Sequence, residues 1–92
     1  MTPDIEAKIA VDFSLAERQE ALGVLRLLED EMGPGEHSRV LRCVVSLAQG
    51  DLTRLFHFAD RATQDYRDVV YWAEYDEHNR RVRDLNLPFP EP

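Results

Sequence analysis

The stretch Val45-Ser-Leu-Ala-Gln-Gly-Asp-Leu-Thr-Arg-Leu55 decides the fold, because a helix stop and a helix start stand back to back at its centre. Gly50 suits the left-handed residue that closes a helix. Asp51 suits the N-cap of the next helix, where a short acceptor can bind a free backbone N–H. Apolar residues recur at helical spacing on both sides of this pair. The sequence therefore predicts a helical hairpin that turns at Gly50-Asp51.

The two arms of this hairpin differ in the width of their apolar faces. The arm before the turn, from about residue 37 to 49, has a wide face that indicates a central position, formed by Val40, Leu41, Val44, Val45, Leu47 and Ala48. The arm after the turn is expected to bury a narrower stripe, with His57 on the opposite side; the stripe consists of Leu52, Leu55, Phe56, Ala59 and Ala62.

The N-terminal segment can be read in two ways. Thr2-Pro3-Asp4 is typical of a helix start, with threonine as N-cap and proline in the first turn. Ile5, Ile9 and Phe13 then recur every four residues, although the same segment also alternates as a strand would. We favour a short helix, because no partner strand is evident except a weak candidate over residues 81–87.

A second helix is predicted to begin at Ser14, because Ser14-Leu-Ala-Glu17 matches the capping box. Its expected buried stripe is Ala21, Leu22, Leu25, Leu28 and Met32. Gly23 interrupts this helix, and we expect that it permits a close approach of another helix. The sequence Gly33-Pro34-Gly35 should end the helix.

The last clear helix is predicted to start at Thr63 or Asp65 and to present Tyr66, Val69, Val70 and Ala73 inward. A helical continuation over residues 76–85 is left open, whereas the prolines of residues 88–92 exclude a helix there. The predicted fold class is therefore all-α, a small bundle of four to five helices. Residues 1–87 form a single helical domain, and residues 88–92 form an extended Pro-rich tail.

Part of the chain carries a resemblance to a known family. The pattern Gly50-Asp-Leu-x-Arg-Leu, followed by Asp65-Tyr-Arg-Asp-Val and Trp72-Ala-Glu-Tyr75, resembles a family of small uncharacterised bacterial helical proteins. The resemblance covers roughly residues 38–75. It implies a bacterial origin, and it implies no activity, cofactor or site residue.

Composition limits the classes of function. The 92 residues suffice for one domain with a thin core. The single Cys43 cannot form an intrachain disulfide, and no signal peptide or apolar membrane span is evident, so we expect a reduced, cytoplasmic setting. The net charge of −7 and the lack of a basic patch argue against nucleic-acid binding. We expect many of the ten arginines to pair with the chain's own acids.

Two constellations offer an alternative function as a small enzyme or metal-binding protein that uses acidic and His residues within residues 57–78. The first is the crowded set near Glu74, in which His78 would lie one helical turn away, together with Asp76 and Glu77. The second brings His57 near the acids at 60, 65 and 68, with Cys43 and His37 as a further possible pair. Neither matches a specific motif, so we assign no catalytic, cofactor-binding or metal residue.

Aromatic residues give the strongest functional signal. A thin core should not accommodate Tyr71, Trp72 and Tyr75 together, and tyrosine and tryptophan are prominent in interface hot spots. Packing of these rings within the chain, against the N-terminal helix or the tail with Phe89, is the competing interpretation. With Phe58 added, these residues form the predicted interface of a non-enzymatic interaction module, which we expect to be a homodimer.

Overall fold

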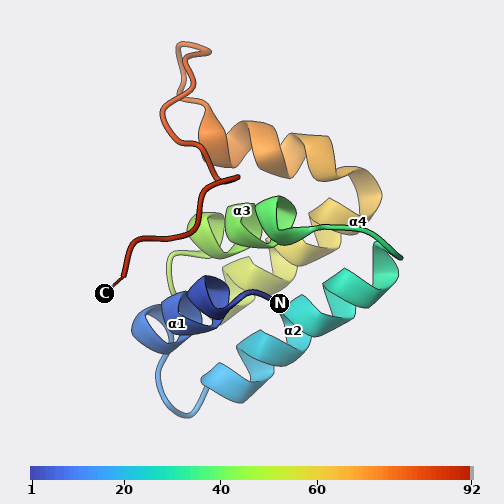
Figure 1. Cartoon of the computed structure of the whole chain (residues 1–92), viewed down its shortest axis with the longest axis vertical. Helices are drawn as coiled ribbons and strands as arrows, with labels where there is room; N and C mark the ends of the chain where they lie inside the picture. The colour runs from blue at the N-terminus through green and yellow to red at the C-terminus, as the bar shows by residue number, and fades with distance from the viewer. Residues whose placement is uncertain (92) are drawn as a thin grey trace.

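The protein is all-helical over residues 1–91, the part of the chain that the computed structural model describes (Figure 1). The helices are α1 (Pro3–Asp12), α2 (Arg18–Glu31), α3 (Ser38–Ala48) and α4 (Leu52–Glu74). Extended pairing within these residues is limited to one isolated antiparallel bridge between Tyr75 and Arg81. The predicted all-α class is confirmed. No helix in this range is both long and apolar enough to cross a membrane.

Helix α3 occupies the centre of the bundle, as its wide apolar face predicted. Leu41, Cys43, Val44, Val45 and Ala48 have no exposed surface. The helix packs most extensively on α4 and also contacts α1, while α2 packs on α4 and α1 (Figure 1). Helices α1 and α4 thus pack directly on α3, and both charged networks described below include one of its arginines.

The turn between α3 and α4 has the backbone geometry that its sequence favours. Gln49 and Gly50 adopt positive φ angles of 51° and 76°. Asp51 is the N-cap of α4, and its Oδ1 accepts a hydrogen bond from the Arg54 backbone N–H at 3.0 Å. A Cβ on Gly50 would lie 2.5 Å from the Asp12 carbonyl oxygen, so this turn also lies against the end of α1. Glycine at position 50 therefore meets two requirements, a positive φ angle and the absence of a Cβ atom beside Asp12.

Helix α1 settles the choice between helix and strand, because Ile5, Ile9 and Phe13 are buried along one side of it. Thr2 is the N-cap residue, but its hydroxyl donates to the Asp4 side chain and does not accept from a backbone N–H. The predicted capping box is wrong. Ser14 precedes a turn in which its carbonyl, rather than its hydroxyl, accepts the Glu17 and Arg18 N–H groups at 3.0 and 3.1 Å, and α2 begins at Arg18.

Helix α4 is bent at Asp65, whose φ of −157° and ψ of 99° are not helical. We call residues 52–64 its first arm and residues 66–74 its second arm. The sequence predicted two separate helices that meet at about residues 63–65, and these correspond to the two arms of α4. The structure therefore has four helices in residues 1–91. The expected burial of Phe56 and Tyr66 is wrong, because their side chains remain 47% and 52% exposed.

The helix does not continue over residues 76–85. Asp76 Oδ1 instead accepts the backbone N–H groups of His78 and Arg80, at 2.8 and 3.0 Å, and Asn79 has a positive φ of 61°. Together these features close a tight turn, after which the chain returns past the end of α4. The short acidic side chain offers the backbone an alternative to helical hydrogen bonds.

Glu74, the last residue of α4, holds this returning segment to the bundle. Its carboxylate is fully buried and accepts two bonds from Arg39, at 2.9 and 2.6 Å, and one from the Leu85 N–H at 3.1 Å. Arg81 Nη2 lies 3.1 Å from the same carboxylate. The hydrogen bonds from Arg39 lower the pKa of Glu74 despite its burial. The sequence offered Glu74 only as part of an alternative metal site, and in the structure it is an anion that holds the fold together.

Arg42 on α3 forms hydrogen bonds with residues near both ends of the described chain. Its guanidinium donates to Asp4 on α1, with an Nε–Oδ2 distance of 2.8 Å, and to the carbonyls of Leu85 and Asn86 at 3.2 and 3.3 Å. Asp4 also accepts the Phe89 N–H at 3.1 Å. Figure 1 shows the C-terminal segment passing beside α3 toward α1. Residues 86–91 contain no helix or strand, and Pro92, the last residue of the predicted tail, lies outside the described residues.

Candidate functional site

The four predicted interface residues form two aromatic pairs that share the second arm of α4. Trp72 on this arm meets Phe58 on the first arm in an edge-to-face contact, with ring centroids 6.3 Å apart and an interplanar angle of 66°. Tyr71 stacks on Tyr75, with centroids 5.2 Å apart and an angle of 15°. Successive helical residues point about 100° apart, so the two pairs lie on neighbouring sides of the arm.

The two pairs each combine a more exposed ring with a more buried one. Trp72 and Tyr71 are 45% and 46% exposed to solvent, whereas Phe58 and Tyr75 are half-buried. Phe58 also packs against the hydrophobic core. Edge-to-face and offset-stacked contacts are the arrangements that aromatic rings prefer. The exposed rings are therefore each supported by a more buried neighbour.

An ion pair runs parallel to the Phe58–Trp72 contact across the bend of α4. Arg61 Nη2 on the first arm lies 2.5 Å from Asp68 Oδ2 on the second arm. Arg61 follows Phe58 by three residues, and Asp68 precedes Trp72 by four, so the two contacts are successive connections between the same helical sides. The aromatic contact and the ion pair therefore both connect the two arms, and the ion pair neutralises Arg61 and Asp68.

The alternative metal site is not assembled. Because α4 ends at Glu74, His78 lies in an exposed turn and not one helical turn along the same helix. Glu74 is enclosed by arginines, as described above. Within residues 1–91, no three His, Cys, Asp or Glu side chains are placed to hold a metal ion together.

The alternative catalytic residues have other partners. Cys43 is fully buried in α3, and this burial raises the pKa of its thiol to about 12. The His37 Nε2 atom bonds the Gly33 carbonyl at 2.9 Å. Asp65 binds Arg67, and the hydrogen bonds from Arg67 lower the pKa of the Asp65 carboxyl. Asp68 pairs with Arg61, as above, and His57 is exposed. The closeness of these candidate catalytic residues in the sequence therefore did not predict their burial or their bonding partners.

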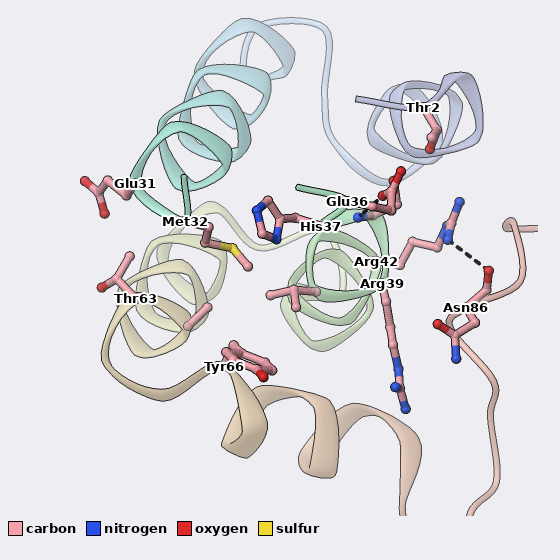
Figure 2. Close-up of a pocket in the computed structure, with 13 residues that line it drawn as sticks. Thr2, Glu31, Met32, Glu36, His37, Arg39, Arg42, Thr63, Tyr66 and Asn86 are labelled. Atoms are coloured by element: carbon pink, nitrogen blue, oxygen red, sulfur yellow. Dashed lines mark hydrogen bonds between the residues drawn. The ribbon is translucent and has the colours of Figure 1, made fainter. Parts of the chain in front are cut away.

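Sequence reasoning missed a pocket of about 730 Å³ that lies where the end of α2, the start of α3 and the bend of α4 meet. Figure 2 shows Met32, His37 and Tyr66 around one hollow, with Thr63 on the outer side of the first arm of α4 and Arg39 extending from α3 toward the second arm. No local motif indicates this pocket, because its residues come from distant parts of the sequence. The exposed ring of Tyr66, expected in the core, lines it.

Together these features give residues 1–91 a bundle of four helices with an aromatic surface and a pocket. Comparison of the chain with protein-family models, curated proteins and solved structures finds no match in any of the three. The resemblance of residues 38–75 to small bacterial helical proteins stays a prediction.

Proposed function

We propose that the protein is a non-enzymatic interaction module that forms a homodimer through an aromatic face made of Phe58, Tyr71, Trp72 and Tyr75. The observation that carries this proposal is the state of Trp72, which is 45% exposed and yet held edge-on against Phe58. A large ring that is exposed but already ordered is well suited to contribute to an interface.

Order in the free protein matters because association must offset the entropy of immobilising side chains. That cost is about 0.5–1.5 kcal/mol for each flexible side chain fixed at an interface. Contacts with Phe58 and Tyr75 already restrict Trp72 and Tyr71, so these rings lose less freedom on binding. Tryptophan and tyrosine also bury a large area for each residue, which is why they are enriched in binding hot spots.

Electrostatics do not oppose a second copy as the partner when the contact is confined to this face. Two molecules that each carry a net charge of −7 repel one another at long range. Two ion pairs within the chain adjoin the aromatic face, Arg61 with Asp68 and Arg67 with Asp65. A twofold axis would place the same ion-paired patch on both sides of the interface, so aromatic contacts form without opposing like charges.

The alternative of a small enzyme or metal-binding protein built on residues 57–78 has less support. Glu74, Asp65 and Asp68 are three of the acidic residues that such a site would use, and each is engaged by an arginine. Their positive partners lower the affinity expected for a metal cation.

Analytical ultracentrifugation over a range of concentrations tests the proposal. We expect wild-type protein to dimerise and Trp72→Ala to weaken the dimer by more than tenfold, as loss of a hot-spot residue commonly does. The matched control is Leu27→Ala on α2, where a 59% exposed apolar residue lies outside the aromatic face. A wild-type protein that stays monomeric at millimolar concentration, or equal effects of the two substitutions, would contradict the proposal.

A further inference from the structure

We infer that a shallow groove between α2 and the first arm of α4 binds an amphipathic helix of a partner protein, one that carries lysine or arginine beside its apolar face. The groove has a volume of about 190 Å³. None of the four residues of the aromatic face lines it, so this inference goes beyond the proposed dimer and does not depend on it.

The walls of the groove are apolar and open to solvent. Val24 and Leu27 line it from α2, and Phe56 lines it from α4. Leu27 is 59% exposed and Phe56 is 47% exposed, whereas Leu28 and Ala59 between them are buried. Covering exposed apolar surface contributes about 25 cal/mol for each Å² removed from water. These walls therefore favour a partner that presents apolar side chains.

The dimensions of the groove suit a side chain of a helix rather than a small molecule. Its volume is below the roughly 300–1,000 Å³ that is usual for small-molecule sites. Gly23, one turn before Leu27 on α2, has no atom within 4 Å of an added Cβ, so the space beside Leu27 is open. A second helix can therefore lie along α2 and insert an apolar residue between Leu27 and Phe56, as in helix-in-groove recognition.

The charges beside the groove favour a basic partner. Glu31 and Asp60 line it, and no lysine or arginine does. Figure 2 shows Glu31 pointing away from the Met32, His37 and Tyr66 hollow. Neither acid forms an ion pair within residues 1–91, although Asp60 accepts a hydrogen bond from the neutral Gln64 amide at 3.0 Å. Both carboxylates can thus pair with bases of a partner.

The same charges argue against a second copy of the chain in this groove. Residues 1–36 contain nine acids and three bases, and α2 belongs to this acidic half. Two copies that met here would oppose unpaired carboxylates, whereas a basic helix would be attracted at long range and held in register. The groove and its charges together therefore specify a basic amphipathic helix.

Two-dimensional ¹H–¹⁵N NMR with designed peptides tests this inference. The probe is a peptide of about 18 residues, long enough to form a helix, with leucines at i, i+3, i+4 and i+7 and lysines beside them. We expect saturable shifts at the amides of Val24, Leu27, Phe56 and Ala59. One control peptide has the same composition without an apolar face, and another has glutamate for each lysine. Each control should bind at least tenfold more weakly.

Substitutions in the walls separate the groove from the aromatic face. Phe56→Ala should weaken binding of the lysine peptide about tenfold, and Leu27→Ala in the opposite wall provides a second variant. Both side chains are about half exposed, so the folded spectrum should persist. Trp72→Ala removes a similarly exposed ring outside the groove and should leave the affinity unchanged.

A second pair of variants tests the charges. Glu31→Gln should weaken binding about threefold at low salt, and the difference should disappear in about 1 M salt, where screening is strong. Glu77→Gln changes the net charge equally at an 87% exposed residue outside the groove and should have no effect. Absence of saturable shifts, equal binding of either control peptide, unaffected Phe56→Ala and Leu27→Ala variants, or equal effects of Glu31→Gln and Glu77→Gln would each overturn the inference.

Discussion

Arg39 and Glu74 form a two-pronged salt bridge between α3 and the end of α4, in which the carboxylate is completely buried while the arginine side chain is 39% exposed. This difference in burial between the two side chains determines how much stability a substitution of Glu74 should remove. When Glu74 is replaced by glutamine, Arg39 and Arg81 can regain water, but the Leu85 N–H loses an anionic acceptor.

We therefore expect Glu74→Gln to lower the free energy of unfolding by about 2 kcal/mol, below the ~3–5 kcal/mol typical when both charges of a pair are buried. Urea denaturation followed by circular dichroism measures this change. Glu77→Gln, at a side chain 87% exposed, is the control and should have little effect. Equal stability of the two variants would show that the buried carboxylate does not hold the C-terminal segment.

Acid should destabilise the protein through Asp4 and Glu74. The hydrogen bonds from Arg42 hold the pKa of the Asp4 carboxyl far below its ordinary value, and those from Arg39 lower the pKa of Glu74. Unfolded carboxyls titrate near pH 4, so below that pH the unfolded state binds protons that the folded state does not. The stabilisation is complete above about pH 5 and is lost as the pH falls through 4 and lower.

Thermal melts between pH 2 and 7 check this dependence. Asp4→Asn should be less stable than wild type at pH 7, and its melting temperature should fall less steeply below pH 4. Glu6→Gln, at an exposed residue of the same helix, should follow the wild-type profile. Parallel profiles for Asp4→Asn and wild type would assign the acid sensitivity to other groups.

Two glycines provide a matched test of backbone requirements. Gly50 has a φ of 76°, and an added Cβ would meet the Asp12 carbonyl oxygen at 2.5 Å. Gly50→Ala should therefore cost more than the ~1–2 kcal/mol of left-handed strain alone. Gly23 in α2 has no atom within 4 Å of an added Cβ, so its predicted role in close helix packing is wrong.

Gly23→Ala should instead stabilise the protein by about 0.5–1 kcal/mol, because alanine restricts the unfolded chain and favours a helix. Thermal melts of both variants give the comparison directly. Opposite signs are expected, and a destabilising Gly23→Ala would reveal a packing constraint near α2.

Cys43 should be unreactive in the folded protein. Burial raises the pKa of its thiol to about 12, so almost no thiolate is present at pH 7 and reagents cannot reach it. A colorimetric thiol reagent should therefore modify Cys43 slowly in buffer and quickly in 8 M urea. Rapid modification of the folded protein would indicate that α3 is exposed by frequent opening.

The helices were predictable because each depends on local spacing. Ile5, Ile9 and Phe13 recur with the period of a helix, and the Gly50-Asp51 turn has a separate physical reason for each residue. The start of α2 was not predictable from the Ser14–Glu17 motif. The hydroxyl and the carbonyl of Ser14 compete for the same backbone N–H groups, and the sequence does not decide which of the two binds them.

The environments of the functional candidates depend on contacts between distant segments. Tyr66 was expected inside because its spacing matches the inner face formed by Val69, Val70 and Ala73, but it is half exposed and lines the pocket. The abundance of arginine predicted internal ion pairs in general, yet the pairing of Arg39 with Glu74 spans 35 residues of sequence. Periodicity predicts which side of a helix is apolar, and it carries no information about such partners.

The attachment of the C-terminal segment has a consequence for hydrogen exchange. The backbone N–H groups of Leu85 and Phe89 donate to the carboxylates of Glu74 and Asp4, and that of Val82 donates to the Glu74 carbonyl, although this segment has almost no regular secondary structure. Chain ends usually exchange within seconds, because they fray independently of the core. Here the two carboxylates are fixed by arginines of the central helix and the Glu74 carbonyl belongs to the end of α4, so these amides should exchange only when the bundle opens as a whole. Residues 82–89 would then belong to the same cooperative unit as the bundle.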